Sequence, residues 1–402
     1  MTSSLRIIVT GLIAQHPLLG GVTWDYLQYV LGLVRLGHDA YYIEDTGEWP
    51  YDRRGGSTGS DYEVEDCSPN VEYLGNVMAR FGLADKWAYR CPIDSRWFGL
   101  SEARRVALLK SADLLINISG TLVRPEEYRA VHRLAYIDSD PVFTQVKLAR
   151  GQANFRKQVD AHDVHFSFGE WLTEAVPATG HEWRPTRQPI VLSEWRRSDL
   201  TREVFTTVMN WTSYNPILHD GQRYGQKDLE FEQFLDLPAR VTPTVLEIAI
   251  RGTKRRRIPE SLLTYKGWRV VDPLAACPDL DSYRDYIACS KAEWSVAKNA
   301  YVIGRAGWFS CRSACYLATG RPVVVQDTGF SPVLPTGEGI LPFETMDEAV
   351  EAIRAVEGDY ERHAKAARAI AETYFASDKV LGRLVDEAMD GPSSGIPRAP
   401  RA

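Results

Sequence analysis

The sequence predicts an α/β protein made of two Rossmann-like, doubly wound domains that face each other across a cleft. Three observations lead to this prediction. Short apolar runs alternate with helical patterns, as in parallel sheets covered by helices on both faces. The alternation stops in a Pro- and Arg-rich stretch between Trp183 and Trp195 and then starts again. Finally, 402 residues exceed one ordinary core and fit two domains of about 200 residues each.

The first half begins with a buried parallel strand at Leu5–Val9, because this run is continuously apolar. A glycine-bearing loop follows, and then an amphipathic helix over Trp24–Leu36 that Gly37 ends. The further strands that we predict in this half are Ala40–Ile43, Leu114–Ile118, Leu134–Ile137 and Val164–Phe168.

The second half repeats the alternation. Its predicted strands are Val204–Met209, Leu246–Ile250, Arg269–Val271, Ala300–Ile303 and Pro322–Gln326, and its predicted late helices are Asp347–Glu357, Tyr360–Phe375 and Val380–Met389. We therefore divide the chain into a first domain (1–200), a second domain (201–376), a C-terminal helix (377–390) and a tail (391–402). Pro, Ser, Gly and Arg dominate the tail, which predicts disorder.

Composition excludes several classes of protein. A formal net charge of -6 and a pI of about 5.8 argue against broad binding of nucleic acid or anionic membranes. The six cysteines form no C-x-x-C pair and no metal-ligand set, so we expect reduced thiols and no metal. The apolar run Ile7–Ala14 is too short for a signal peptide, and no stretch approaches the roughly 20 apolar residues of a membrane span. We expect a cytoplasmic protein.

The stretch from Arg305 to Phe330 carries the strongest chemical signal. Gly307 permits a tight turn that opens a helix near Ser310, and the unsatisfied N–H groups at a helix start suit a phosphate. Arg312 adds a full positive charge in reach of a diphosphate. The loop after strand Pro322–Gln326 faces the cleft. The candidate donor ligands here are Trp308, Phe309, Ser310, Asp327, Thr328 and Gly329. The alternative is an ordinary βα turn with a buried aromatic pair.

Four segments resemble the GT-B glycosyltransferases, in particular the large, mostly retaining family and the spore-coat-like group. Residues 316–325 (YLATGRPVVV) are similar to the family segment EAMAAGRPVV, which is the most specific match. Residues 334–340 (LPTGEGI), with Glu348 and Ala349 after them, resemble the family's next passage. Near the start of the chain, residues 17–21 (PLLGG) and 36–39 (LGHD) resemble its opening loop and first helix end. Between Pro50 and Leu200 nothing matches.

The resemblance implies a GT-B architecture, in which the first domain faces the acceptor and the second binds a nucleotide-sugar donor. The chain departs from the pattern at two positions. Cys315 stands where the family has a Glu that binds the donor ribose, and Gly307 stands where it has an earlier Glu. A different group must therefore hold the ribose.

Further donor contacts are predicted by analogy with this architecture. The first loop of the second domain, with Thr212, Ser213 and Tyr214, approaches the phosphates, and Gly20 and Gly21 let the backbone of the first domain come close to them. Lys227 is the candidate cation that neutralises the leaving diphosphate, unless it is a plain surface lysine. Asp272 is a candidate contact for the base.

The general base that an inverting enzyme would need is sought in the first domain. His16 follows the first strand and titrates near neutral pH, although a loop histidine can also be structural. Asp138 ends a strand that faces the cleft, where it could act as base or only hold the local backbone. Trp24, Trp97, Trp211 and Trp308 are candidates to stack on sugars, unless they belong to the core.

These residues predict a metal-independent glycosyltransferase, hexosyl or related, of a bacterial type. The donor is a nucleotide-diphosphate sugar of unknown base, and the acceptor is a small molecule or a glycan rather than nucleic acid. A sugar-nucleotide epimerase or hydrolase and a non-catalytic sugar-nucleotide-binding module remain alternatives. No G-x-G-x-x-G or P-loop pattern supports a nicotinamide enzyme or a P-loop enzyme. Alanine at Arg312 is expected to remove turnover and leave folding intact.

Overall fold

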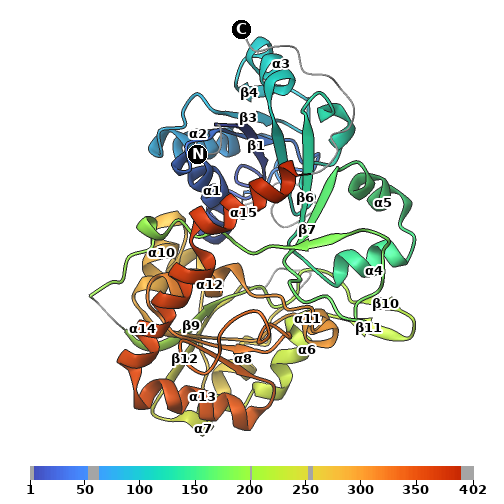
Figure 1. Cartoon of the computed structure of the whole chain (residues 1–402). Helices are drawn as coiled ribbons and strands as arrows, with labels where there is room; N and C mark the ends of the chain where they lie inside the picture. Colours follow the sequence, from blue (N-terminus) through green and yellow to red (C-terminus); the bar gives the residue numbers. More distant parts are fainter. Residues whose placement is uncertain (1–3, 53–62, 200–201, 252–256, 391–402) are drawn as a thin grey trace.

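A computed structural model describes residues 4–52, 63–199, 202–251 and 257–390 of the chain. Two α/β lobes lie one above the other in Figure 1, the N-terminal lobe in blue to green and the C-terminal lobe in yellow to red. This confirms the predicted fold class. The predicted disordered tail, 391–402, lies outside the described residues.

In the part of the chain that is described, the N-terminal lobe is built on an eight-stranded sheet of order β4-β3-β2-β1-β5-β6-β7-β8, parallel except for the β3–β4 pair. Alternate residues of β1 face opposite ways, because Ile7 and Val9 join one apolar core and Ile8 joins another with Leu108. The strands are β1 (Arg6–Thr10), β2 (Asp39–Glu44), β3 (Trp87–Arg90), β4 (Trp97–Gly99), β5 (Leu114–Ile118), β6 (Arg133–Asp138), β7 (Val164–Ser167) and β8 (Trp183–Pro185).

Helices cover this sheet on both faces, as the apolar runs of its strands require. They are α1 (Gly20–Arg35), α2 (Ser68–Arg80), α3 (Glu102–Ser111), α4 (Phe143–Ala149) and α5 (Ala153–Asp160), with short 3-10 turns η1 (Pro125–Tyr128) and η2 (Leu192–Glu194).

The C-terminal lobe is built on a parallel sheet of order β13-β12-β9-β14-β15-β16. Counted from its own first strand, this is the Rossmann order 3-2-1-4-5-6, in which the connections change direction between β9 and β14. The strands are β9 (Arg202–Val208), β12 (Val245–Ala249), β13 (Arg269–Val271), β14 (Ser290–Ser295), β15 (Val323–Gln326) and β16 (Ile340–Phe343), and a separate hairpin joins β10 (Ile217–His219) to β11 (Gln222–Tyr224).

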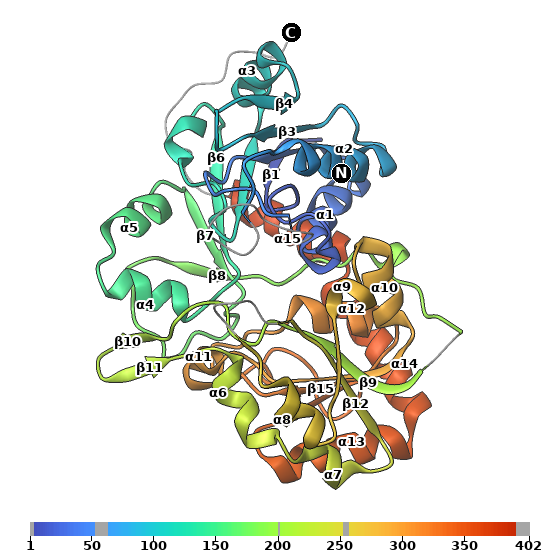
Figure 2. The same cartoon turned by 180° about the vertical axis from the view of Figure 1, so that it is seen from behind.

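The helices of this lobe again lie on both faces of its sheet (Figure 2). They are α6 (Lys227–Phe231), η3 (Glu232–Phe234), α7 (Leu237–Val241), α8 (Glu260–Tyr265), α9 (Pro273–Ala276), α10 (Leu280–Ala288), α11 (Asn299–Gly304), α12 (Cys311–Ala318), α13 (Met346–Gly358) and α14 (Tyr360–Ile370), followed by the π-turn η4 (Ala371–Phe375).

The last helix, α15 (Ser377–Met389), leaves the C-terminal lobe and packs on the N-terminal one (Figure 1). A side chain at Gly32 of α1 would collide with Leu381 and Ser377, so the two helices touch closely there. Ile190, in the linker between the lobes, forms a β-bridge with Ala376 just before α15. The chain therefore crosses between the lobes twice at one place.

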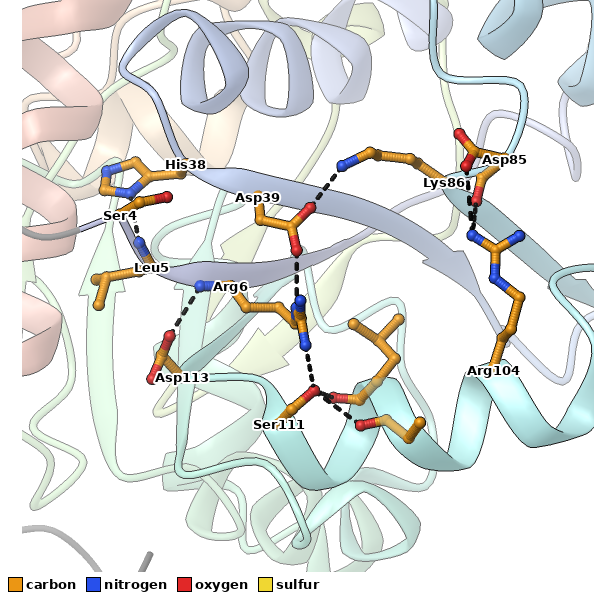
Figure 3. Close-up of polar contacts among 12 residues, drawn as sticks. Ser4, Leu5, Arg6, His38, Asp39, Asp85, Lys86, Arg104, Ser111 and Asp113 are labelled. Carbon is orange, nitrogen blue, oxygen red and sulfur yellow. Dashed lines mark hydrogen bonds and ion pairs between the residues drawn. The ribbon is translucent and has the colours of Figure 1, made fainter. Parts of the chain in front are cut away.

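The amino ends of the first sheet are tied together by charged side chains (Figure 3). The Arg6 Nε donates to Asp39 at 2.7 Å, and Lys86 pairs with the other oxygen of the same carboxylate. The backbone N–H of Arg6 donates to Asp113 at 2.8 Å. Burial would raise the pKa of Asp39, but hydrogen bonds from Lys86 and Arg6 outweigh it and lower the pKa below its usual value. These contacts hold the strands together at their amino ends, opposite the carboxyl ends of the sheet.

One prediction of secondary structure is wrong. Residues 300–303 lie in helix α11, and the strand that belongs there is β14, ten residues earlier in the chain. A four-residue apolar run cannot distinguish a buried strand from a buried helix turn. The helix predicted over Tyr360–Phe375 is confirmed, with its last five residues, Ala371–Phe375, in π-helical form. The domain boundary near residue 200 stays a prediction; it falls between the ends of β8 and the start of β9.

Candidate active site

A pocket of about 610 Å³ lies between the two lobes. It is lined by residues at or beyond the carboxyl ends of β1, β5 and β6 in one lobe and β9 in the other, among them Gly20, Ser119, Asp138 and Asn210. These are the carboxyl ends of the parallel strands, and the directions of the connections change between β1 and β5 and between β9 and β14. Ligands of doubly wound sheets bind at such points. The pocket is therefore where both sheets would place a ligand.

Lys227 contributes a buried cation to this pocket. It is the first residue of α6, and among the described residues its ammonium group has no hydrogen-bond or ion-pair partner. Burial lowers the pKa of Lys227 well below its usual value, the nearby Arg312 and Lys298 lower it further, and Glu293 opposes them. An anion bound beside Lys227 would reverse this shift. The side chain is thus placed for a negatively charged ligand.

Arg312 contributes a second cation, but it is held by the protein. Its Nε donates to Glu293 at 2.6 Å and its Nη1 donates to the carbonyl of Val208 at 2.8 Å. Glu293 is fully buried, and its second oxygen has no hydrogen-bond partner among the described residues. The pair argues against the expectation that alanine at position 312 leaves folding intact, because the substitution would leave a buried charge without its partner.

Two helix starts face the same pocket. Ser310 precedes α12 and lines the pocket, as predicted, and its side chain makes no capping hydrogen bond. Helix α1 begins at Gly20 and Gly21, which also line the pocket, and it has no acidic residue in its first turn. The leading N–H groups of both helices have no acceptor within their own helix and carry partial positive charge. Lys227 and Arg312 thus meet two positive helix ends in a pocket that Lys147, Arg251 and Lys298 also line.

The start of α1 is fixed by contacts on both sides. A side chain at Gly20 would lie 2.2 Å from the carbonyl oxygen of Asp279 in the other lobe, so only glycine fits. In the loop before α1, the carboxylate of Glu44 accepts hydrogen bonds from the amides of Ala14, at 2.8 Å, and Gln15, at 2.6 Å. The loop and the opposite lobe together determine where the α1 amides point.

Asp25, one turn into α1, is a pocket residue that the sequence analysis missed. No described residue donates a hydrogen bond to its carboxylate, which is half-buried and lines the pocket. Burial raises the pKa of Asp25 to about 7, and the positive charge of Arg312 opposes the rise. The signal was a single acid in a helix that is otherwise apolar on almost every side.

Asp138 lines the pocket, but its oxygens are occupied by the protein. They accept hydrogen bonds from Thr144 at 2.7 Å, Gln145 at 2.9 Å, Ser167 at 2.9 Å and the amide of Asp140 at 3.1 Å. Burial raises its pKa to about 6, and these hydrogen bonds oppose the rise. A carboxylate with four donors has no lone pair left for an acceptor, so the arrangement favours the structural alternative for Asp138.

Asp140 joins the lobes at one side of the pocket. Its oxygens accept hydrogen bonds from Lys298 at 2.7 Å and Tyr214 at 2.8 Å, and a further one from Tyr301, all three from the C-terminal lobe. The pKa of Asp140 is lowered, because these partners outweigh the effect of burial. Tyr214 therefore lies behind Asp140 rather than in the pocket.

The structure brings many of the predicted site residues together. Those that line the pocket are Gly20, Gly21, Asp138, Thr212, Ser213, Lys227, Trp308, Ser310 and Arg312. Of the four tryptophans proposed to stack on sugars, Trp211 and Trp308 line it as well. Trp24 is instead fully buried between the lobes, where its indole N–H donates to the carbonyl of Leu280 at 2.8 Å. Trp97 stacks against Arg105 at the far edge of the first sheet.

Two predicted residues from loops lie outside the pocket lining. The ring of His16 stacks on Tyr51, with centroids 4.9 Å apart. Asp272 caps α9 through the amide of Leu274, at 2.9 Å, and its neighbours Pro273 and Leu274 line the pocket in its place. Neither position supports the role that the sequence analysis gave to the side chain.

The remaining residues outside the pocket support the turn that leads into α12. Phe309 packs between Phe330 and Phe375 in the core. Asp327 pairs with Arg305 at 2.9 Å, and Thr328 donates to the carbonyl of Trp308. Gly329 has a φ of 86°, and a side chain there would collide with Arg305. These residues position Trp308 and Ser310 for the pocket rather than lining it themselves.

Two further features, a metal site and a membrane span, are absent from the part of the chain that the structure describes. No group of three or more His, Cys, Asp or Glu side chains is arranged to hold a metal ion in the described part of the chain. Among the helices described, none combines the length and the apolar character that crossing a membrane requires.

Comparison with known proteins identifies the fold. No family model and no curated protein matches the chain. Solved structures do match it over almost its whole length. An alpha-glucosyltransferase in complex with UDP and a 13-mer DNA containing a HMU base is 12% identical with a TM-score of 0.59, and the match covers 96% of this chain and 100% of the other. This chain has the GT-B fold.

Two other proteins of the same fold match as well. HepE of Anabaena, in complex with UDP and glucose, is 12% identical with a TM-score of 0.56, over 95% of this chain and 99% of that one. A sucrose-phosphate synthase from Thermosynechococcus elongatus is 11% identical with a TM-score of 0.51, over 95% and 98%. In the GT-B fold of this chain, the pocket between the lobes is the candidate active site.

Proposed function

We propose that this protein transfers a sugar, hexosyl or related, from a nucleotide-diphosphate donor to a hydroxyl or amine acceptor without a metal ion. One observation carries the proposal. In the cleft of a GT-B fold, the unpartnered ammonium group of Lys227 lies beside Arg312 and the open helix start at Ser310. All three groups attract an anion.

The chemistry of glycosyl transfer needs this arrangement. The bond between the anomeric carbon and the diphosphate oxygen breaks, and the electron pair stays on the departing nucleoside diphosphate. Negative charge therefore grows on its terminal phosphate in the transition state. A fixed cation at that position stabilises the transition state more than the ground state. Lys227, with Arg312 and the amides of α12, is proposed to supply the charge that a divalent cation supplies in other transferases.

The acceptor is proposed to enter between the lobes on the side of Asp140 and Lys298. Aromatic rings of Phe155, Trp211 and Trp308 line this part of the cleft and offer flat apolar faces to a sugar or a small aromatic molecule. One matched structure contains DNA. The net charge of -6 of this chain favours a small molecule or a glycan over a polyanion.

A panel of nucleotide sugars tests the proposal. The purified protein is incubated with UDP-, GDP-, ADP- and dTDP-linked sugars, and released nucleoside diphosphate and sugar products are followed by mass spectrometry. Slow release of nucleoside diphosphate with free sugar is expected for a transferase that lacks its acceptor, and EDTA should not change the rate. Interconversion of sugar isomers would instead identify an epimerase. No binding of any nucleotide by calorimetry would contradict the proposal and favour a non-catalytic module.

A further inference from the structure

One charged pocket residue has no part in the proposed chemistry so far. Asp25 lines the pocket beside Arg312, and no described residue satisfies its carboxylate. A buried carboxylate without hydrogen-bond donors is costly, and proteins keep one where a ligand completes it. The ligand must bring hydrogen-bond donors to the N-terminal lobe at this point.

The surroundings of Asp25 show which end of the pocket it occupies. A side chain at Gly21 would lie 3.1 Å from the ring of Tyr283, and Trp24 donates to the carbonyl of Leu280, so the part of α1 that carries Asp25 packs against α10. Tyr283 lines the pocket together with Leu274 and Cys277. Lys227, in contrast, responds to Lys298, which is bonded to Asp140. Arg312 acts on both Asp25 and Lys227. It therefore stands between the two ends of the pocket.

A diphosphate held by Arg312 and Lys227 divides the donor into two parts. The sugar and the acceptor take the end with Lys298 and Asp140. The nucleoside takes the end with Tyr283, Leu274 and Cys277, which includes Asp25. At that end the donor offers two adjacent hydroxyl groups, those of its ribose. A carboxylate accepts hydrogen bonds from both hydroxyl groups at once, as acidic residues do in dinucleotide sites.

Helix α12 itself has no carboxylate to offer there. Cys315 is buried under α1, and the Asp25 charge dominates its electrostatic surroundings. The carboxylate of α1 thus lies over the position on α12 where the resemblance predicted a ribose ligand. Among the charged residues that line this end, Asp25 is an anion without a partner in the described chain.

We propose that Asp25 binds the ribose hydroxyls of the donor, so that the N-terminal lobe supplies the ribose ligand that the C-terminal lobe lacks. The proposal rests on the proposed function. It makes nucleotide binding depend on contact between the two lobes, since the diphosphate is held mainly by one lobe and the ribose by the other.

Calorimetry with matched nucleotides tests this inference. The wild-type protein is titrated with UDP and 2′-deoxy-UDP, and with the GDP and ADP pairs in parallel. The nucleotide that binds is expected to lose about 10- to 100-fold in affinity without its 2′-hydroxyl, because a hydrogen bond to a charged group is lost. In Asp25→Ala the ribo and deoxy forms should bind equally. Asp39→Asn, a matched change at the amino ends of the first sheet and outside the pocket lining, should keep the wild-type preference.

A conservative variant guards against a trivial loss of structure. Asp25→Glu keeps a carboxylate at the same place on α1 and should retain a preference for the ribo form. An Asp25→Ala protein that still prefers the ribo form as strongly as the wild type overturns the inference, and so does a wild type without any preference. If no nucleotide of any pair binds the wild type, the proposed function fails and this inference fails with it.

Discussion

The amino ends of the strands in the first sheet and the cleft at the carboxyl ends of both sheets treat their charges in opposite ways. At the amino ends of the strands, Asp39 is paired with both Arg6 and Lys86 (Figure 3). At the carboxyl ends, Asp25 and Lys227 face the pocket with no hydrogen-bond partner in the described chain. Opposed pKa shifts follow, since the pKa of Asp39 is lowered and that of Asp25 is raised to about 7. The amino ends of the first sheet thus carry paired charges that stabilise the fold, and the pocket at the carboxyl ends keeps charges without described partners for a ligand.

The largest effect on stability is expected at Arg312, which pairs with buried Glu293 and also lines the pocket. Arg312→Ala should lower the free energy of unfolding by about 3–5 kcal/mol, because Glu293 would stay buried without its cation. Denaturation in urea measures the change. Replacing both partners, as Glu293→Gln/Arg312→Met, should restore most of the stability but not the turnover. Equal stability of Arg312→Ala and wild type would show that the pair does not hold the fold.

Lys227 should separate activity from stability. Lys227→Met is expected to reduce turnover about 10²- to 10³-fold, the usual cost of removing a group that stabilises transition-state charge. Stability should stay the same or rise, because a buried ammonium group without a partner costs folding energy. Product release and thermal unfolding measure the two effects.

Lys86→Met is the matched control at the amino ends of the first sheet. It breaks the pair with Asp39 and should cost up to about 1 kcal/mol of stability with no change in turnover. If Lys227→Met unfolded at a lower temperature than wild type and Lys86→Met lost turnover, the distinction between a charge kept for a ligand and a charge kept for stability would be wrong.

Asp39→Asn should show the pH dependence of a paired carboxylate. The lowered pKa of Asp39 means that its contribution is present above the pKa of the unfolded chain, about 4, and is lost as the pH falls through the folded pKa. The variant should therefore be less stable than wild type by about 1 kcal/mol at neutral pH, with the gap closing in acid. Chemical denaturation as a function of pH checks this.

Asp25→Asn should show the opposite trend. Its raised pKa gives the folded protein stability below about pH 4, and this is lost as the pH rises to the folded pKa of about 7. The variant does not titrate, so its melting temperature should rise relative to wild type across that range and level off above it. A flat difference from acid to neutral pH would contradict a buried, partnerless carboxylate.

The fold could be predicted from the sequence wherever apolar runs were long and regular. The strand at Leu114–Ile118 was found with its exact bounds, and its neighbours within a residue or two. The run at residues 300–303 was misread because four apolar residues fit a helix turn as well as a strand. Among the strands that were not predicted, β14 carries Ser290, Lys291 and Glu293, and these polar residues mask the apolar pattern of a buried strand.

The site could be predicted only in part. The helix start at Ser310 and the charge of Arg312 have a local signal in the turn at Gly307, and Lys227 was predicted by analogy with the GT-B architecture. Phe309 and Asp327 share that neighbourhood in sequence, but their side chains turn into the core and toward Arg305. Asp25 could not be placed, because Arg312 and Tyr283, which line the same pocket, come from distant parts of the chain and lie near it only once the lobes are packed.

The double crossing of the chain restricts how the cleft can open. Ile190 and Ala376 form a bridge where the linker and the start of α15 pass each other, so both covalent links lie on one axis. Rotation about that axis separates the lobes and keeps the bridge, whereas sliding of one lobe along the other would break it. Trimming the chain before Ser377 would remove one of the two links and uncover the apolar surface of α1 around Gly32, so a shortened protein should open freely and self-associate.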